Sequence, residues 1–106
     1  MAENLDNRRV KIGVIGVGGR AVGLIGTMAE MGVAEITALS DVRPEKMEEG
    51  LKVIREHADY PVSFYTDYHE LLAREDIEGV VIATSWNDHT KIAIDSMKAG
   101  KYTGFE

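Results

Sequence analysis

A glycine-rich turn near the start of the chain has the residue types and spacing that hold a pyrophosphate. Gly16-Val17-Gly18-Gly19-Arg20-Ala21 fits the pattern G-x-G-x-x-A. In this pattern the first glycine allows a tight turn and the second lets the backbone approach a phosphate. The final small residue keeps the following helix close to the strand. The free N–H groups and the dipole of that helix then face the phosphates. We therefore predict a dinucleotide site with contacts from Gly16, Gly18, Gly19, Arg20 and Ala21, and the alternative is a purely structural turn.

An acid lies at the distance from this turn at which an adenosine ribose is bound. Asp41 follows Ala21 by about 20 residues, at the end of a second apolar stretch. A carboxylate there accepts hydrogen bonds from the ribose and repels a 2′-phosphate, which favours NAD over NADP. The alternative role is N-cap of the helix that Pro44 starts, and the two roles are compatible. Arg43 can stack on the adenine or, if Asp41 turns away, accept a phosphate.

A second polar stretch follows a later apolar run. We predict a loop from Thr84 to His89 at the cofactor edge, with Thr84, Ser85, Trp86 and His89 as cofactor contacts. Trp86 can instead be a hydrophobic lid on the domain, and His89 can be a cap near a helix start. Glu106 ends the last predicted strand at the same edge, and its alternative is simply the end of the chain.

Other catalytic patterns are absent from the sequence. No nucleophile stands beside a base, and no two carboxylates are placed for acid–base work. The three histidines show neither an i,i+4 pair nor an H-E-x-x-H pattern, so we predict no metal site. Any redox chemistry would therefore come from the dinucleotide, and the catalytic residues stay unassigned.

Apolar runs alternate with helical patterns along the whole chain. The runs 10–15, 35–40, 62–65, 79–83 and 101–105 predict strands, and the segments between them predict helices. Gly50 within the second predicted helix is mildly unfavourable, because glycine has a low helix propensity. Such alternation predicts an α/β fold: a doubly wound, five-stranded parallel sheet (Rossmann) in the order 3-2-1-4-5. Ligands then bind at the carboxyl ends of the strands, between the first and fourth.

Composition limits the classes of partner. The chain has 106 residues, enough for one domain with a core. Its net charge of −6 disfavours nucleic acid or an anionic membrane as the main partner. We expect a flexible polar tail over residues 1–9 and a dinucleotide-binding domain over 10–106. The absence of cysteine excludes disulfides and suits the cytoplasm.

Taken together, these motifs resemble the N-terminal domain of the Gfo/Idh/MocA oxidoreductases, the glucose–fructose oxidoreductase and inositol dehydrogenase superfamily. The resemblance covers essentially residues 10–106. It rests on five stretches: Ile12 to Arg20, Ser40 to Val42, Tyr65 to Leu72, Val81 to Thr84, and Ala99 to Tyr102.

Two departures from the family pattern concern the candidate site. The family usually reads Thr-Pro-Asn-x-x-His after the fourth strand, whereas here Ser85 replaces the proline and Trp86 the asparagine. Trp86 and the Tyr-x-Gly-x-Glu ending look more like the branch of NAD-dependent glycosidases, which hydrolyse by transient oxidation. The matching residues Thr84, His89 and Glu106 would contact the nicotinamide half of the cofactor. The family's lysine that is often tied to catalysis would follow Glu106.

The resemblance implies a cofactor-binding part of a larger enzyme. In the family a second α/β domain supplies most substrate contacts and the oligomer surface, so we expect a homo-oligomer with a carbohydrate-like substrate. We expect this chain alone to be inactive. The main hypothesis is an NAD-dependent oxidoreductase acting on a sugar, polyol or related hydroxyl compound. An NAD-dependent glycoside hydrolase of the same superfamily and a non-catalytic dinucleotide-binding module are the alternatives.

Overall fold

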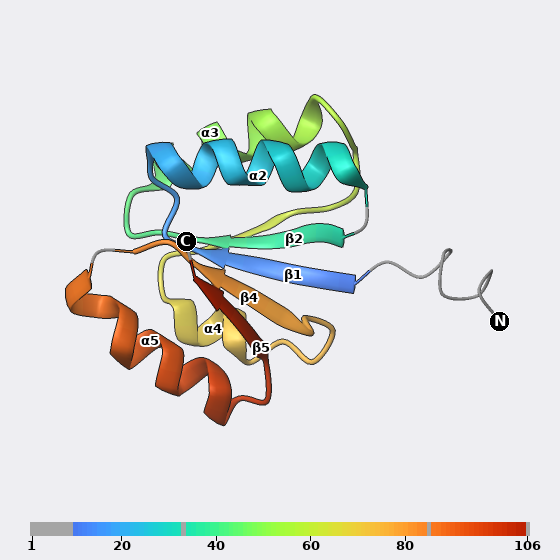
Figure 1. Cartoon of the computed structure of the whole chain (residues 1–106). Helices are drawn as coiled ribbons and strands as arrows, with labels where there is room; N and C mark the ends of the chain where they lie inside the picture. Colours follow the sequence, from blue (N-terminus) through green and yellow to red (C-terminus); the bar gives the residue numbers. More distant parts are fainter. Residues whose placement is uncertain (1–9, 33, 85, 106) are drawn as a thin grey trace, which may run out of the picture.

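The computed structural model describes residues 10–32, 34–84 and 86–105. Within these residues strands and helices alternate (Figure 1) in the following order: β1 (Val10–Ile15), α2 (Gly19–Met31), β2 (Ala34–Ser40), α3 (Pro44–Arg55), β3 (Ser63–Tyr65), α4 (Tyr68–Leu72), β4 (Gly79–Ile82), α5 (Trp86–Lys98) and β5 (Tyr102–Phe105). None of these helices is long and apolar enough to cross a lipid bilayer.

The five strands form one sheet in the predicted order. The order is β3-β2-β1-β4-β5, and every neighbouring pair is parallel. Helices α2 and α3 cover one face of the sheet and α4 and α5 cover the other (Figure 1). The doubly wound Rossmann arrangement is thus confirmed. It follows from right-handed crossovers, which place consecutive helices on the same face until the strand order reverses.

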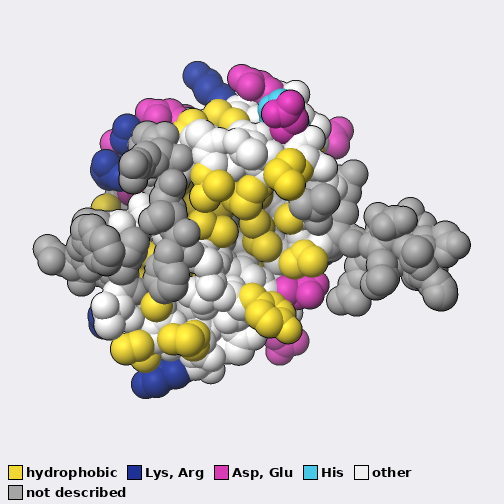
Figure 2. Space-filling view, in the orientation of Figure 1, with side chains coloured by type: hydrophobic (Ala, Val, Ile, Leu, Met, Phe, Trp, Pro, Cys, Tyr) yellow, Lys and Arg dark blue, Asp and Glu magenta, His cyan; other side chains and the backbone are white. Residues whose placement is uncertain are grey.

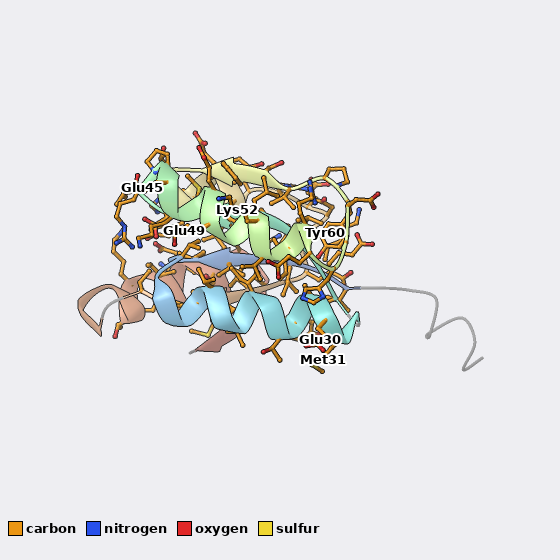
Figure 3. The ribbon with its side chains drawn as sticks, turned by 90° about the horizontal axis from the view of Figure 1, so that it is seen from above. Glu30, Met31, Glu45, Glu49, Lys52 and Tyr60 are labelled. Carbon is orange, nitrogen blue, oxygen red and sulfur yellow. The ribbon has the colours of Figure 1, made fainter. Side chains whose placement is uncertain are left out.

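Each face of the sheet has its own apolar core, because successive side chains of a strand point to opposite faces. Val14 packs with the helices α2 and α3, in a cluster that includes Ile25, Leu39 and Ile54. Its neighbour Ile15 packs on the opposite face, against residues of α4, β4 and α5. The charged residues of α3, such as Glu45, Glu49 and Lys52, are exposed beside α2 (Figure 3).

The structure gives Gly50 of α3 a packing role, whereas the sequence pattern presents it only as an unfavourable helix residue. The glycine is buried, and a Cβ at this position would lie 3.1 Å from Leu39 Cδ1 and 3.2 Å from Val17 Cγ1. The residue therefore allows α3 to approach the sheet and the glycine-rich turn closely. The close packing of α3 explains why glycine stands here despite its unfavourable helix propensity.

The start of α5 corrects one prediction. The sequence predicts a loop from Thr84 to His89, but the helix begins at Trp86. Residues 86–98 contain neither glycine nor proline, so nothing in the chain prevents the helix from starting early. Trp86 and His89 thus belong to the first turns of a helix that begins two residues after Thr84, and Trp86 is not a loop residue.

Charged side chains do not gather into one basic surface on the face seen in Figure 2, where Lys and Arg lie at the margins and acidic groups stand among them. This distribution fits the net charge of −6. A phosphate backbone needs clustered cations, and this face offers none among the described residues.

Candidate functional site

Gly16 makes the turn that brings three strands together at one point. It directly follows β1, has a φ of +92°, and donates its N–H to the Ser40 carbonyl at the end of β2 at 2.7 Å. A Cβ here would lie 2.7 Å from Thr84 Cγ2 and 2.9 Å from the Ala83 carbonyl oxygen. Both the backbone conformation and the space therefore require glycine.

Gly18 stands at the start of α2 with open space in front of it. It is the N-cap residue, and an added Cβ would have no atom within 4 Å. Its carbonyl accepts the first helical hydrogen bond, from Val22 N at 3.0 Å. Ala21 is buried and seats the helix on the sheet, as the motif predicts. The helix N-terminus thus opens onto free volume, a geometry that suits an anion.

Other members of the motif are described only in part. The backbone of Gly19 and Arg20 begins α2, and the Arg20 side chain lies outside the description. The side chains of Trp86 and His89 also lie outside it, as do Ser85 and Glu106 entirely. Their predicted cofactor contacts remain predictions.

Asp41 lies directly after β2 and accepts four hydrogen bonds. Its Oδ2 accepts Val17 N at 2.8 Å and Arg43 Nη2 at 3.2 Å, and its Oδ1 accepts Arg43 N at 2.8 Å and Arg43 Nε at 3.0 Å. The carboxylate therefore ties the glycine-rich turn to the start of α3. The alternative N-cap role is wrong, because the N-cap residue of α3 is Arg43 and Asp41 lies two residues before it.

The charge on Asp41 is stabilised despite its burial. Burial alone would raise the pKa of this carboxyl, since it disfavours the charged form. The hydrogen bonds from the Arg43 side chain and from the backbone of Val17 and Arg43 outweigh burial and lower the pKa below its ordinary value. The group is thus an anion at neutral pH and acts only as an acceptor.

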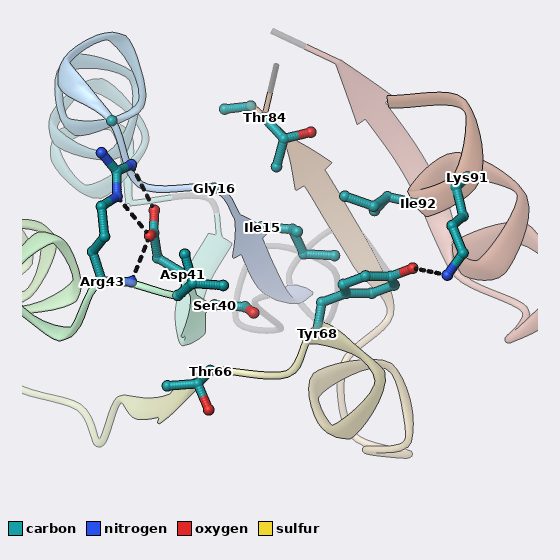
Figure 4. A pocket seen from close by; sticks show the side chains of 13 residues that line it. Ile15, Gly16, Ser40, Asp41, Arg43, Thr66, Tyr68, Thr84, Lys91 and Ile92 are labelled. Carbon is teal, nitrogen blue, oxygen red and sulfur yellow. Dashed lines mark hydrogen bonds and ion pairs between the residues drawn. The ribbon is translucent and has the colours of Figure 1, made fainter. Parts of the chain in front are cut away.

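Thr84, directly after β4, supplies a polar atom without a partner. Its Oγ1 is buried and has no hydrogen-bond partner among the described residues. Thr84 is one of the residues that line the cavity drawn in Figure 4, and its methyl group lies beside Gly16 of the glycine-rich turn. A buried hydroxyl that lacks a partner is costly, and a bound molecule can satisfy it.

These groups line a single cavity of about 530 Å³ at the carboxyl ends of β1, β2 and β4. It is the switch point between β1 and β4, where this fold binds ligands. Figure 4 shows Asp41 and Arg43 on one side of it and Tyr68, Lys91 and Ile92 on the other. The full lining consists of Ile15, Gly16, Gly18, Ser40, Asp41, Val42, Arg43, Thr66, Tyr68, Ala83, Thr84, Lys91 and Ile92.

The sequence motifs do not single out the Tyr68 side of this cavity. The Tyr68 hydroxyl donates to Asp95 Oδ2 at 2.6 Å and accepts from Lys91 Nζ at 3.2 Å. Burial, followed by the hydrogen bond to the anionic Asp95, raises the pKa of Tyr68. The available signal was position, because Thr66 and Tyr68 follow β3 and all the parallel strands end at this edge.

No group of three or more histidine and acidic side chains is placed to hold a metal ion in the part of the chain that the structure describes. The cavity instead combines an apolar floor with a helix N-terminus and a buried anion. That combination matches the parts of a dinucleotide: flat base, pyrophosphate and ribose.

Comparison with known proteins agrees with this geometry. The model of the Gfo/Idh/MocA oxidoreductase family, described as having an NAD-binding Rossmann fold, matches residues 10–106. The chain belongs to this family. A glycosyl hydrolase family 109 protein of Solibacter usitatus is 36% identical over 106 residues, covering 94% of this chain and 24% of the relative. One of Shewanella amazonensis is 37% identical over 101 residues, covering 92% of this chain and 22% of the relative.

Among solved structures, myo-inositol dehydrogenase from Lactobacillus casei in complex with NAD(H) and myo-inositol shares the fold. The TM-score is 0.83 at 23% identity, over 92% of this chain and 28% of the dehydrogenase. The chain therefore spans about a quarter of the length of the curated relatives that it matches.

Proposed function

We propose that this chain binds NAD in the cavity between the glycine-rich turn and α5, as the cofactor domain of a redox-assisted glycoside hydrolase. The residues present fit the cofactor. A Cβ at Gly16 would collide with Ala83 and Thr84, whereas the space before Gly18 is open for a pyrophosphate. The Thr84 hydroxyl, which has no partner in the described part of the chain, gives a further polar contact for the bound molecule.

A different set of residues binds each part of the cofactor. The N–H groups at the start of α2, beside Gly18, hold the pyrophosphate. Asp41 accepts from the adenosine ribose, and its charge favours NAD over NADP. By family resemblance, Thr84, His89 and Glu106 contact the nicotinamide half. When bound, NAD supplies a hydride acceptor, and this chain orients it.

The reaction class rests on one observation. The two curated relatives at 36% and 37% identity are glycosyl hydrolases, whereas the inositol dehydrogenase is 23% identical and shares the fold. Trp86 and the Tyr-x-Gly-x-Glu ending support the same branch. The second candidate is an NAD-dependent dehydrogenase of a sugar or polyol, which the description of the matching family as oxidoreductases favours.

Consumption of NAD separates these two candidates. The gene product that contains this chain is incubated with a panel of nitrophenyl glycosides and, separately, with polyols, with NAD well below the substrate concentration. A redox-assisted glycosidase restores NAD in each cycle, so released nitrophenol exceeds the NAD supplied and NADH does not accumulate. Accumulation of NADH with a polyol and no release of nitrophenol would show the dehydrogenase instead.

We further propose that substrate contacts and the oligomer surface come from protein outside this chain. The chain covers 24% and 22% of the two relatives, so most of the length of each relative lies outside the matched part. This chain alone should then bind NAD without converting a substrate. Measurable turnover by the 106-residue chain would contradict the proposal.

A further inference from the structure

Arg43 occupies the positions on Asp41 that a ribose would need. A carboxylate oxygen has two lone pairs, and each oxygen of Asp41 already accepts two N–H groups. Figure 4 shows the guanidinium lying across the carboxylate at the edge of the cavity. The Asp41 side chain is only 4% exposed, so little of it faces the cavity. A sugar hydroxyl finds no free acceptor there.

Only the guanidinium contacts can be given up at low cost. The bonds from Val17 N and Arg43 N come from backbone that the glycine-rich turn and the start of α3 hold in place. The Arg43 side chain is 50% exposed and can rotate into water. Release of Nε and Nη2 frees one acceptor position on each oxygen. Two free positions on adjacent oxygens match the two neighbouring hydroxyls of a ribose.

The released guanidinium also has a place to go. Glu45 and Glu49 lie on α3, the helix that Arg43 caps, and after Asp41 they also raise the pKa of Arg43. Its planar fork suits a phosphate as well as it suits a carboxylate. A dinucleotide with a 2′-phosphate would therefore pair with the Arg43 guanidinium. A dinucleotide with a free 2′-hydroxyl would instead compete with that guanidinium for Asp41.

We propose that Arg43 determines the cofactor preference of this site by competing with the ribose of NAD for Asp41 and by pairing with the 2′-phosphate of NADP. The proposal rests on the proposed cofactor function. Arg43 therefore weakens NAD binding and reduces the selectivity that Asp41 alone would give. If Arg43 merely stacked on the adenine, it would instead strengthen NAD binding.

The test is the affinity of the chain for NAD and for NADP, measured by calorimetry for the original chain and for Arg43→Ala. We expect the substitution to tighten NAD and weaken NADP, each by about threefold or more. Lys52→Ala is the matched control, because Lys52 is an exposed cation on α3, the helix that Arg43 caps, and is not among the cavity residues. It should leave the ratio of the two affinities unchanged. Arg43→Gln should act in the same direction as Arg43→Ala.

An NMR signal follows the competition directly. The Arg43 Nε–H should be protected from solvent exchange in the free chain, since it donates to Asp41 at 3.0 Å, and should lose protection when NAD saturates the site. Normal NAD binding by the original chain, combined with weaker or unchanged NAD binding by Arg43→Ala or with persistent protection, would overturn the proposal. If the folded original chain binds no NAD, the proposed function itself fails and this inference falls with it.

Discussion

Two glycines of the same turn should respond differently to the same substitution. Gly16→Ala places a Cβ 2.7 Å from Thr84 Cγ2 and 2.9 Å from the Ala83 backbone, at a φ of +92°. Gly18→Ala places a Cβ in open space, at a φ of −95° that any residue adopts. The first change should therefore damage the fold, and the second should damage only ligand binding.

The expected magnitudes follow from these contacts. The positive φ costs alanine about 1–2 kcal/mol, and insertion of a methyl group into packed structure costs about 1–3 kcal/mol. Gly16→Ala should thus lose about 2–5 kcal/mol, a large share of the roughly 5–15 kcal/mol that stabilises a domain. Gly18→Ala should lose less than about 1 kcal/mol, the effect of a poorer N-cap residue. It should weaken NAD by about tenfold or more, or about 1.4 kcal/mol, since its methyl group meets the pyrophosphate.

The assay pairs thermal unfolding with calorimetric titration of NAD on the same preparations. Gly16→Ala should melt roughly 10 °C or more below the original chain, and Gly18→Ala within a few degrees of it. Wild-type affinity in Gly18→Ala would refute the assignment of the pyrophosphate to the start of α2. Wild-type stability in Gly16→Ala would refute the account of the turn.

Three further predictions concern single contacts. Asp41 has a lowered pKa, so its contribution to the free energy of unfolding is complete above its ordinary value of 3.8 and disappears as the pH falls through the lower folded value. In urea unfolding at about pH 5 and about pH 3, Asp41→Asn should therefore lose less stability on acidification than the original chain, and an equal loss would contradict this. Thr84→Val removes a buried hydroxyl that has no partner among the described residues, so thermal unfolding should show unchanged or slightly raised stability, while calorimetry should show NAD about three- to tenfold weaker. Unchanged NAD affinity in this variant would mean that the hydroxyl does not contact the cofactor. Gly50→Ala should lose about 1–3 kcal/mol in denaturant unfolding, because its Cβ would crowd Leu39 and Val17, and a neutral result would show that α3 can move away freely.

Most of the fold can be predicted from the sequence because it follows from alternation. Apolar runs separated by helical patterns leave few topologies once crossovers are right-handed, and the observed strand order is the predicted one. The turn at Gly16 and the buried Ala21 follow from spacing alone, since each place in the motif has one mechanical requirement.

The features that could not be predicted from the sequence depend on tertiary contacts or lack a local pattern. The start of α5 at Trp86 could not be read from periodicity, because the first turn of that helix lacks a regular apolar pattern. The packing role of Gly50 depends on how closely α3 approaches Leu39, which only the tertiary structure shows. The same holds for the Tyr68–Lys91 pair and for Arg43 on Asp41. These contacts join side chains whose rotamers are set by the assembled cavity.

The central claim is that the cavity beside Gly18 binds NAD. Calorimetric titration of the folded 106-residue chain with NAD tests it most directly, with Gly18→Ala as the matched variant. The account predicts saturable binding at one site per chain, weakened by about tenfold or more in the variant while its melting temperature stays close to that of the original chain. A cooperatively folded chain that gives no binding heat with NAD would contradict it.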